Sequence, residues 1–209
     1  EDFDLAKSMN NNAHRFSIEW SRIEPEEGKF NQQGIEHYRK VLQALRARGL
    51  EPYVTLHHFT NPVWFAKKGG WTNKRSPEYF SKYTEYVAAY LGKEIKFWIT
   101  LNEPMVVNSL GYISGRWPPF HKRDFFGYIC VLKNMARAHC LVYKAIHKYN
   151  AQSRVGVAQS TVYFEAYNGQ LISKVGIYVA RYFWNELFLN KIARYQDFRM
   201  DSFRNLQII

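Results

Sequence analysis

Cysteines and long apolar runs are scarce in this chain of 209 residues. Its two cysteines, Cys130 and Cys140, are too few for a disulfide framework and lack the Cys-x-x-Cys spacing of a zinc site, so we expect both to be reduced core residues. No apolar stretch approaches the roughly 18 residues of a membrane span, and no signal-like leader opens the sequence. These absences favour a cytoplasmic protein without a membrane partner.

Acidic residues are few relative to basic ones, since 18 Asp plus Glu stand against 29 Lys plus Arg and give a formal net charge of +11. A charge of this size would attract nucleic acid or an acidic surface. The basic residues are nevertheless spread along the chain, in helix-like stretches such as 38–48, and form no separate arm. Solvated helix faces explain them better. We therefore expect no nucleic-acid partner, and a basic nucleic-acid binder is the least favoured alternative.

Apolar residues make up 46% of the chain and aromatic residues 17%, which is enough to bury one core of ordinary size. Four short stretches rich in β-branched and aromatic residues predict buried strands, at 15–20, 52–56, 96–101 and 154–158. The sequence therefore predicts one domain with at least four strands.

Helical spacing follows each strand. The first helix runs through Ile35 and Leu45 and stops at Gly49, and the second has a capped start at Ser76 and stops at Gly92. Two more are predicted, at about 125–149 and 171–193. The inward side of the third is expected to carry Ile129, Leu132, Ala136, Cys140, Tyr143 and Ile146.

Strand and helix alternate without a linker, which indicates an α/β fold of parallel strands joined by right-handed crossovers. This pattern alone fits an open doubly wound sheet or a closed barrel. Long polar and aromatic segments follow the strand ends, at 57–73, 102–124 and 159–169, as they do in barrels. No Gly-rich phosphate loop follows any strand, so a nucleotide-binding sheet is less favoured.

Glu103 follows the strand at 96–101 directly, where a barrel places its catalytic groups. Burial beside Trp98 and Phe97 would raise the pKa of its carboxyl and suit a proton donor. Asn102 beside it could bond a sugar hydroxyl. The alternative is a carboxylate that caps a helix or pairs with a cation.

Three ordered segments carry a family resemblance: 15–23 (Arg-Phe-Ser-Ile-Glu-Trp-Ser-Arg-Ile), 55–59 (Thr-Leu-His-His-Phe) and 100–104 (Thr-Leu-Asn-Glu-Pro). They resemble signatures of glycoside hydrolase family 1, the β-glucosidase and β-galactosidase family. Shorter matches lie between and after them, at 69–71, 136–139 and 182–185. The resemblance covers about residues 4 to 198.

The resemblance implies a retaining mechanism in a (β/α)8 barrel that acts on a β-glucoside or related glycoside, with no metal or organic cofactor. It implies that Glu103 is the general acid and base, that Asn102 holds the sugar 2-hydroxyl and that His58 contacts another sugar hydroxyl. Arg15 corresponds to the arginine that lies against the nucleophile. Without the resemblance, His58 would be interpreted as a core histidine. His57 is expected to be structural in either case.

The sequence also departs from the family. It contains no Thr-Glu-Asn-Gly motif, whose glutamate is the family's nucleophile, and Met105 stands where many relatives have a tryptophan that stacks on the leaving group. The family's first strand is missing, and Glu19 and Glu165, the first candidates for a substitute nucleophile, look structural. We expect an incomplete (β/α)8 TIM barrel of about four to five βα units at 1–198, with a divergent tail at 199–209.

Two functions remain open at this point. The first is a β-glucosidase-like hydrolase of O-glycosyl bonds with weak, poorly anomer-selective residual activity. The second is a catalytically inactive scaffold that binds sugars or a partner. Open barrel edges would in either case favour self-association.

Overall fold

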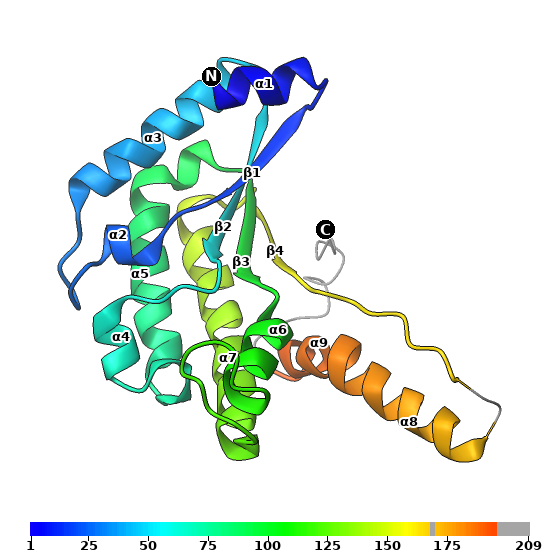
Figure 1. Ribbon diagram of the computed structural model, residues 1–209. Helices are drawn as coiled ribbons and strands as arrows, with labels where there is room; N and C mark the ends of the chain where they lie inside the picture. Colours follow the sequence, from blue (N-terminus) through cyan, green and yellow to red (C-terminus); the bar gives the residue numbers. More distant parts are fainter. Residues whose placement is uncertain (168–169, 196–209) are drawn as a thin grey trace.

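The computed structural model describes residues 1–167 and 170–195, and within them four parallel strands form one sheet in the order β1-β2-β3-β4 (Figure 1). These are β1 (Ala13–Ser17), β2 (Glu51–His57), β3 (Phe97–Asn102) and β4 (Arg154–Ala158). The long helices lie on one side of the sheet, as in an arc cut from a barrel. The predicted α/β class and the partial barrel are confirmed.

The predicted end of the first strand is wrong. β1 ends at Ser17, and Trp20 begins the short helix α2 (Trp20–Ile23) instead of continuing the strand. The reason is a local cap, because the Glu19 side chain accepts a hydrogen bond from the Ser21 backbone N–H and so favours a helix start over an extended chain. Trp20 is buried either way, and this is why its apolar character suggested a strand.

Three long helices pack behind the strands: α3 (Gln32–Arg46), α5 (Ser76–Leu91) and α7 (Phe125–Tyr149). The short helix α1 (Asp2–Ser8) precedes β1 and has no buried residue. Gly49 adopts a φ of +64° after α3, as expected of a helix stop. Ser76, in contrast, is not the predicted cap: it is the first residue of α5, is buried, and donates its hydroxyl to the Trp71 carbonyl.

The inward face of α7 is largely as predicted, because Leu132, Ala136, Cys140 and Ile146 are buried. Tyr143 is only half-buried, packed against the core, and Ile129 is the exception, with 39% of its surface exposed. It lies near the start of α7. Cys130, in the same region, is half-buried and is not the expected core residue, whereas Cys140 is buried; within the described residues neither cysteine forms a disulfide.

Short elements fill the connections at the strand ends. After β2 come α4 (Val63–Lys67) and η1 (Gly70–Thr72), and η2 (Gly92–Glu94) precedes β3. After β3 come α6 (Pro104–Asn108) and the π-helical η3 (Ser109–Ile113). Apart from η2, these elements lie in the segments 57–73 and 102–124, where the sequence predicts long polar and aromatic connections.

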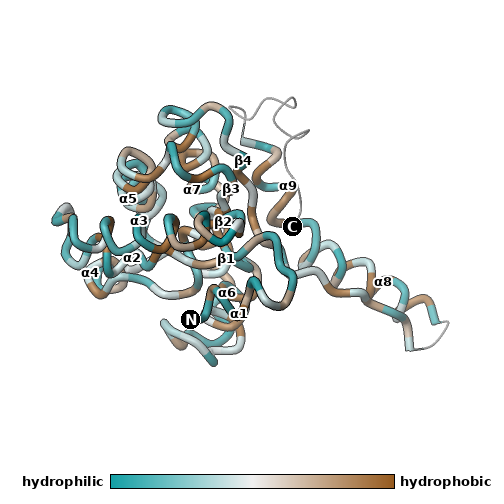
Figure 2. The backbone as a smooth tube through the Cα atoms, turned by 90° about the horizontal axis from the view of Figure 1, so that it is seen from above, coloured by the Kyte–Doolittle hydropathy of each residue, from teal (hydrophilic) through white to brown (hydrophobic). Residues whose placement is uncertain are grey.

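The predicted helix at 171–193 is three elements: α8 (Leu171–Arg181), the π-helical η4 (Tyr182–Glu186) and α9 (Leu187–Ala193). α8 extends away from the rest of the molecule and has no buried residue, although hydrophobic positions run along it (Figures 1 and 2). A crossover helix packs against its own strand and the next one. The described residues hold no strand after α8, so its apolar side chains stay exposed.

The core lies between the sheet and the helices and is strongly aromatic, with Trp20 at its centre against Phe65, Phe80 and Tyr83. The buried Tyr83 hydroxyl donates to the Ile18 carbonyl at 2.9 Å and so ties α5 to the chain after β1.

None of the helices in the described part of the chain is long and apolar enough to cross a membrane. The predicted tail at 199–209, with its boundary at 198, lies outside the described residues.

Candidate active site

A bulge near the end of β3 decides where Asn102 points. β3 pairs Ile99 with Gly156 and Asn102 with Ala158, so three residues of β3 span two of β4. Before the bulge, the Thr100 hydroxyl lies 2.8 Å from His139 Nδ1 on the helix side of the sheet. Strict alternation would place Asn102 on that side too. The extra residue instead turns it to the opposite, inner face, as bulges do near functional sites.

Arg15 lies on the same inner face, projecting from β1. Its Nε donates to Thr55 Oγ1 at 2.9 Å, and its Nη2 donates to Asn102 Oδ1. Partial burial lowers the pKa of the guanidinium, while the nearby Glu103 carboxylate opposes that shift. One arginine thus joins three neighbouring strands and brings a positive charge close to Glu103.

Glu103 has an unusual backbone, with φ +44° and ψ 59° in the left-handed region. This conformation costs a non-glycine residue about 1–3 kcal/mol and is concentrated at functional sites. The Glu103 N–H donates to the Ala158 carbonyl at 2.7 Å, and its carbonyl accepts from the N–H groups of Val106 and Val107. Bonds to β4 and to the first turn of α6 therefore hold the residue in place.

The Glu103 side chain is half-buried and does not serve the alternative roles considered for it. Glu103 occupies the N-cap position of α6, but its carboxylate makes no capping hydrogen bond. Within the described residues it has no ion pair either, and its charge acts on Arg15 and His58 through space. The carboxylate is therefore available to a substrate.

His58 follows β2 directly and is exposed, which does not fit a core histidine. Its Nδ1 lies 3.0 Å from Ser17 Oγ of β1. Partial desolvation of the ring lowers the pKa of the imidazole although the residue as a whole is exposed, the positive charge of Arg15 lowers it further, and Glu103 opposes both. The ring is thus held mostly neutral near pH 7 and can both donate and accept a hydrogen bond.

His57 is fully buried and structural in its contacts, as expected. Its Nε2 lies 3.1 Å from Asn61 Oδ1 and accepts from Trp71 Nε1 at 3.3 Å. Burial lowers the pKa of this imidazole to about 4. It packs edge-on against Trp71 and Phe80 and faces the core.

The two other glutamates that the sequence singles out differ in setting. Glu19 accepts hydrogen bonds from the Ser21 N–H, the Ser21 hydroxyl and the Thr60 hydroxyl, so its carboxylate is already occupied. Glu165 is exposed in the segment after β4.

Met105 is only 1% exposed and cannot lie along a leaving group. Among the described residues, no three His, Cys, Asp or Glu side chains are grouped to hold a metal ion.

The structure therefore brings Glu103, Asn102, Arg15 and His58 to one edge of the sheet, at or near the carboxyl ends of β1, β2 and β3. Sequence reasoning did not anticipate two supporting residues, Thr55 and Ser17, although both lie inside the resembling segments. It had no means to predict the bulge. These four side chains supply a carboxyl group, an amide, a cation and a neutral imidazole. Placed close together, such groups can bind hydroxyl groups and deliver a proton.

Parallel strands, crossover helices and polar groups gathered at the strand ends define the class of (β/α)-barrel enzymes. The model of the family "Glycosyl hydrolase family 1" matches residues 1–206. The chain belongs to this family.

Several relatives agree with this assignment. The chain is 33% identical to Beta-glucosidase A of Thermotoga maritima over 93% of its own length and 44% of that protein. It is also 33% identical to a 6-phospho-beta-galactosidase of Clostridium acetobutylicum, over 77% of the chain and 34% of the relative. The chain thus spans less than half the length of these relatives.

Solved structures give the same result. A beta-glycosidase from Pyrococcus horikoshii superposes with a TM-score of 0.85 at 39% identity, covering 90% of this chain and 44% of that one. The beta-glucosidase from Thermotoga maritima in complex with glucoimidazole gives a TM-score of 0.88 at 30% identity, covering 99% and 48%.

Proposed function

We propose that this chain is a β-glucosidase-like glycoside hydrolase that acts on O-glycosyl bonds, with Glu103 as the proton donor. The observation that carries the proposal is the position of the Glu103 carboxylate, which follows β3 on a strained backbone, does not cap α6 and has no ion pair within the described residues. Protonation of the leaving oxygen is a demanding step in glycoside cleavage and contributes about 10²- to 10⁴-fold to the rate.

The neighbours of Glu103 have separate roles in this proposal. Arg15 occupies Oδ1 of Asn102, so the Asn102 amide group is left to donate its N–H bonds to a sugar hydroxyl. His58, exposed and largely neutral, contacts a second hydroxyl. Arg15 is thus a positioning residue for Asn102. Its positive charge also acts on the Glu103 carboxylate.

The rate and the stereochemistry follow from the missing Thr-Glu-Asn-Gly motif. A retaining glycosidase holds its nucleophile about 5–5.5 Å from the acid, on the far face of the sugar. If the 209-residue chain acts alone, water replaces that carboxylate, and nothing fixes the face it attacks. We therefore propose slow turnover with poor discrimination between α- and β-linked glucosides.

The second candidate is an inactive scaffold that binds a sugar or a partner protein. It is favoured by the same polar groups, because Asn102 and His58 can bind hydroxyls without any chemistry. For either candidate function we also propose self-association through the open strand edges and no nucleic-acid partner. A cytoplasmic location is proposed in line with the relative named "Cytosolic beta-glucosidase" of Cavia porcellus, 35% identical over 74% of the chain.

Matched 4-nitrophenyl α- and β-D-glucosides test the proposed function, with the product anomer followed by NMR. We expect slow release of nitrophenol from both substrates and a mixture of anomers. Strict β-selectivity with clean retention would contradict the proposal and indicate a substitute nucleophile, with Glu165→Gln as the first variant to assay. Saturable binding of the β-glucoside without any turnover would instead select the scaffold.

A further inference from the structure

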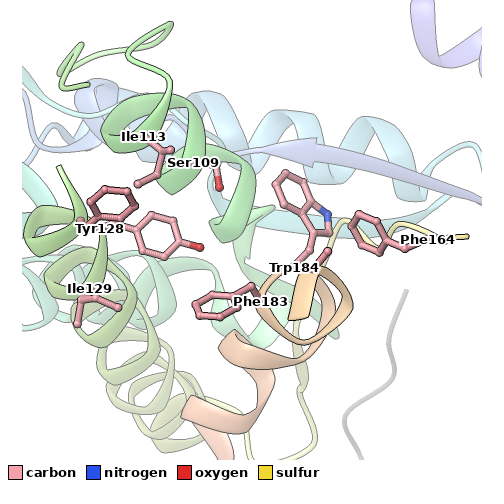
Figure 3. Close-up of a pocket in the computed structure, with 9 residues that line it drawn as sticks. Ser109, Ile113, Tyr128, Ile129, Phe164, Phe183 and Trp184 are labelled. Atoms are coloured by element: carbon pink, nitrogen blue, oxygen red, sulfur yellow. The ribbon is translucent and has the colours of Figure 1, made fainter. Parts of the chain in front are cut away.

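A cavity separate from the candidate active site lies between η3, the start of α7, the segment after β4, the end of α8 and η4 (Figure 3). Its volume is about 480 Å³, within the range of about 300–1,000 Å³ that is usual for small-molecule sites. None of Glu103, Asn102, Arg15 and His58 lines it. Its lining consists of Ser109, Ile113, Phe125, Tyr128, Ile129, Phe164, Ala180, Phe183 and Trp184.

Two π-helical segments border this cavity. η3 contributes Ser109 and Ile113, and η4 contributes Phe183 and Trp184. π-helical turns are rare and are found frequently at functional sites. Both such segments of the described chain face the same space, although more than 60 residues of sequence lie between them.

Side-chain hydrogen bonds fix the wall formed by η4. The Asn185 amide donates to the Val162 carbonyl and accepts from the Val162 N–H, both at 2.9 Å. Gln159 Nε2 donates to the Trp184 carbonyl at 3.0 Å. These hydrogen bonds tie the segment after β4 to η4, so this wall of the cavity is held by contacts within the chain.

The lining is aromatic and aliphatic and includes no charged side chain in the described residues. Its polar groups are the indole N–H of Trp184, which is buried without a hydrogen-bond partner among the described residues, and a pair of hydroxyls. Ser109 and Tyr128 interact, and Figure 3 shows both hydroxyls directed toward the space between η3 and η4. Burial raises the pKa of the Tyr128 phenol, so this hydroxyl keeps its proton. A ligand therefore meets aromatic rings and hydrogen-bonding groups that carry no charge.

We propose that this cavity binds a small, uncharged aromatic molecule that carries one hydroxyl or carbonyl group. Aromatic rings of the ligand would pack against Phe183 and Trp184, and its polar group would bond the Ser109–Tyr128 pair. A carboxylate or sulfonate is excluded, because the lining offers no cation to pair with a buried charge. This binding does not depend on the hydrolytic function proposed above.

Calorimetric titration of the 209-residue chain with 2-naphthol and with 2-naphthoate tests the proposal. We expect one saturable site for 2-naphthol and affinity at least tenfold lower for the anion. Ala180→Trp fills the cavity and should abolish binding, whereas Val179→Trp, on an exposed position of α8 outside the lining, should change affinity less than twofold. Tyr128→Phe should weaken binding about 3- to 10-fold.

Two further variants keep the test decisive. Phe183→Ala replaces Ala180→Trp if circular dichroism finds that variant unfolded, and it should weaken 2-naphthol binding by at least fivefold. Glu103→Gln should leave 2-naphthol binding unchanged, so failure of the hydrolytic function does not affect this result. Equal affinity for 2-naphthoate, non-saturable uptake, or equal losses in Ala180→Trp and Val179→Trp would overturn the proposal.

Discussion

At the scale of single residues, Arg15 controls the electrostatics of the candidate active site. It bonds Asn102 and Thr55, and its charge acts on both Glu103 and His58. The site is therefore coupled, and a change at one member should be measurable at another. Hydrogen bonds to charged groups are worth about 1.5–3 kcal/mol, so this coupling is strong enough to orient the Asn102 amide.

Removing Arg15 should raise the pKa of His58. Burial and the positive charge of Arg15 both lower that pKa, so Arg15→Met removes one of the two lowering causes. Glu103→Gln should have the opposite effect, because the Glu103 carboxylate favours the protonated ring. An NMR titration of the His58 ring in the three proteins measures both shifts. Shifts of the same sign in the two variants would contradict the coupling.

The two buried histidines should make the chain lose stability as the pH falls below about 6.5. Burial holds the pKa of His57 and of His139 at about 4, below the ordinary 6.5 of an unfolded chain. The stabilising contribution is present above pH 6.5 and is lost as the pH falls toward 4, because the unfolded chain then binds protons that the folded one does not. We expect the free energy of unfolding to drop by about 2 kcal/mol for each histidine between pH 7 and pH 5.

Urea unfolding at pH 7 and pH 5 measures this drop. His57→Gln provides the control, since it should reduce the pH-dependent loss by about 2 kcal/mol, about the share of one histidine. A loss that is unchanged in this variant would show that His57 is not the source.

At the scale of elements, the sequence specified which elements form better than where they end. The strands and long helices are predicted because β-branched runs and three- to four-residue apolar spacing reflect burial directly. The end of β1, the start of α5 and the break of 171–193 by η4 depend on caps and local backbone turns. The bulge that turns Asn102 inward arises from pairing between β3 and β4, which no local pattern records.

Helix α3 offers a direct test of one such cap. Asn31 Oδ1 accepts hydrogen bonds from the N–H groups of Gln33 and Gly34. Asn31→Ala should therefore lower the free energy of unfolding by about 1 kcal/mol. Lys40→Ala, on the same helix and away from the cap, should change it by less than about 0.5 kcal/mol. Equal effects of the two variants in urea unfolding would contradict the capping role.

At the scale of the whole molecule, the described part is an arc of a barrel with two open edges, β1 and β4. Beyond β4, α8 exposes Leu171, Val175 and Tyr178 by 54–77%, at a spacing that places them on one helix face. Open strand edges and apolar patches promote association. The 209-residue chain should therefore form dimers or larger species at micromolar concentration.

Sedimentation velocity can detect this association, and Val175→Glu should weaken it by placing a charge within the apolar face. Lys174→Gln, on the neighbouring position of α8, also lowers the net charge by one unit, so it is the matched control and should have a smaller effect. A monomer at all concentrations would contradict the prediction, and equal effects of both variants would show that net charge, rather than the apolar face, drives association.

The central claim is that Glu103 donates the proton, and the dependence of hydrolysis on the leaving group tests it most directly. A poor leaving group such as phenol needs protonation, whereas 2,4-dinitrophenol does not. Glu103→Gln should lower the hydrolysis rate of phenyl β-D-glucoside by about 10²- to 10⁴-fold and leave that of the dinitrophenyl glucoside much less affected. Equal rates for Glu103→Gln and the unmodified chain on phenyl β-D-glucoside would contradict the account.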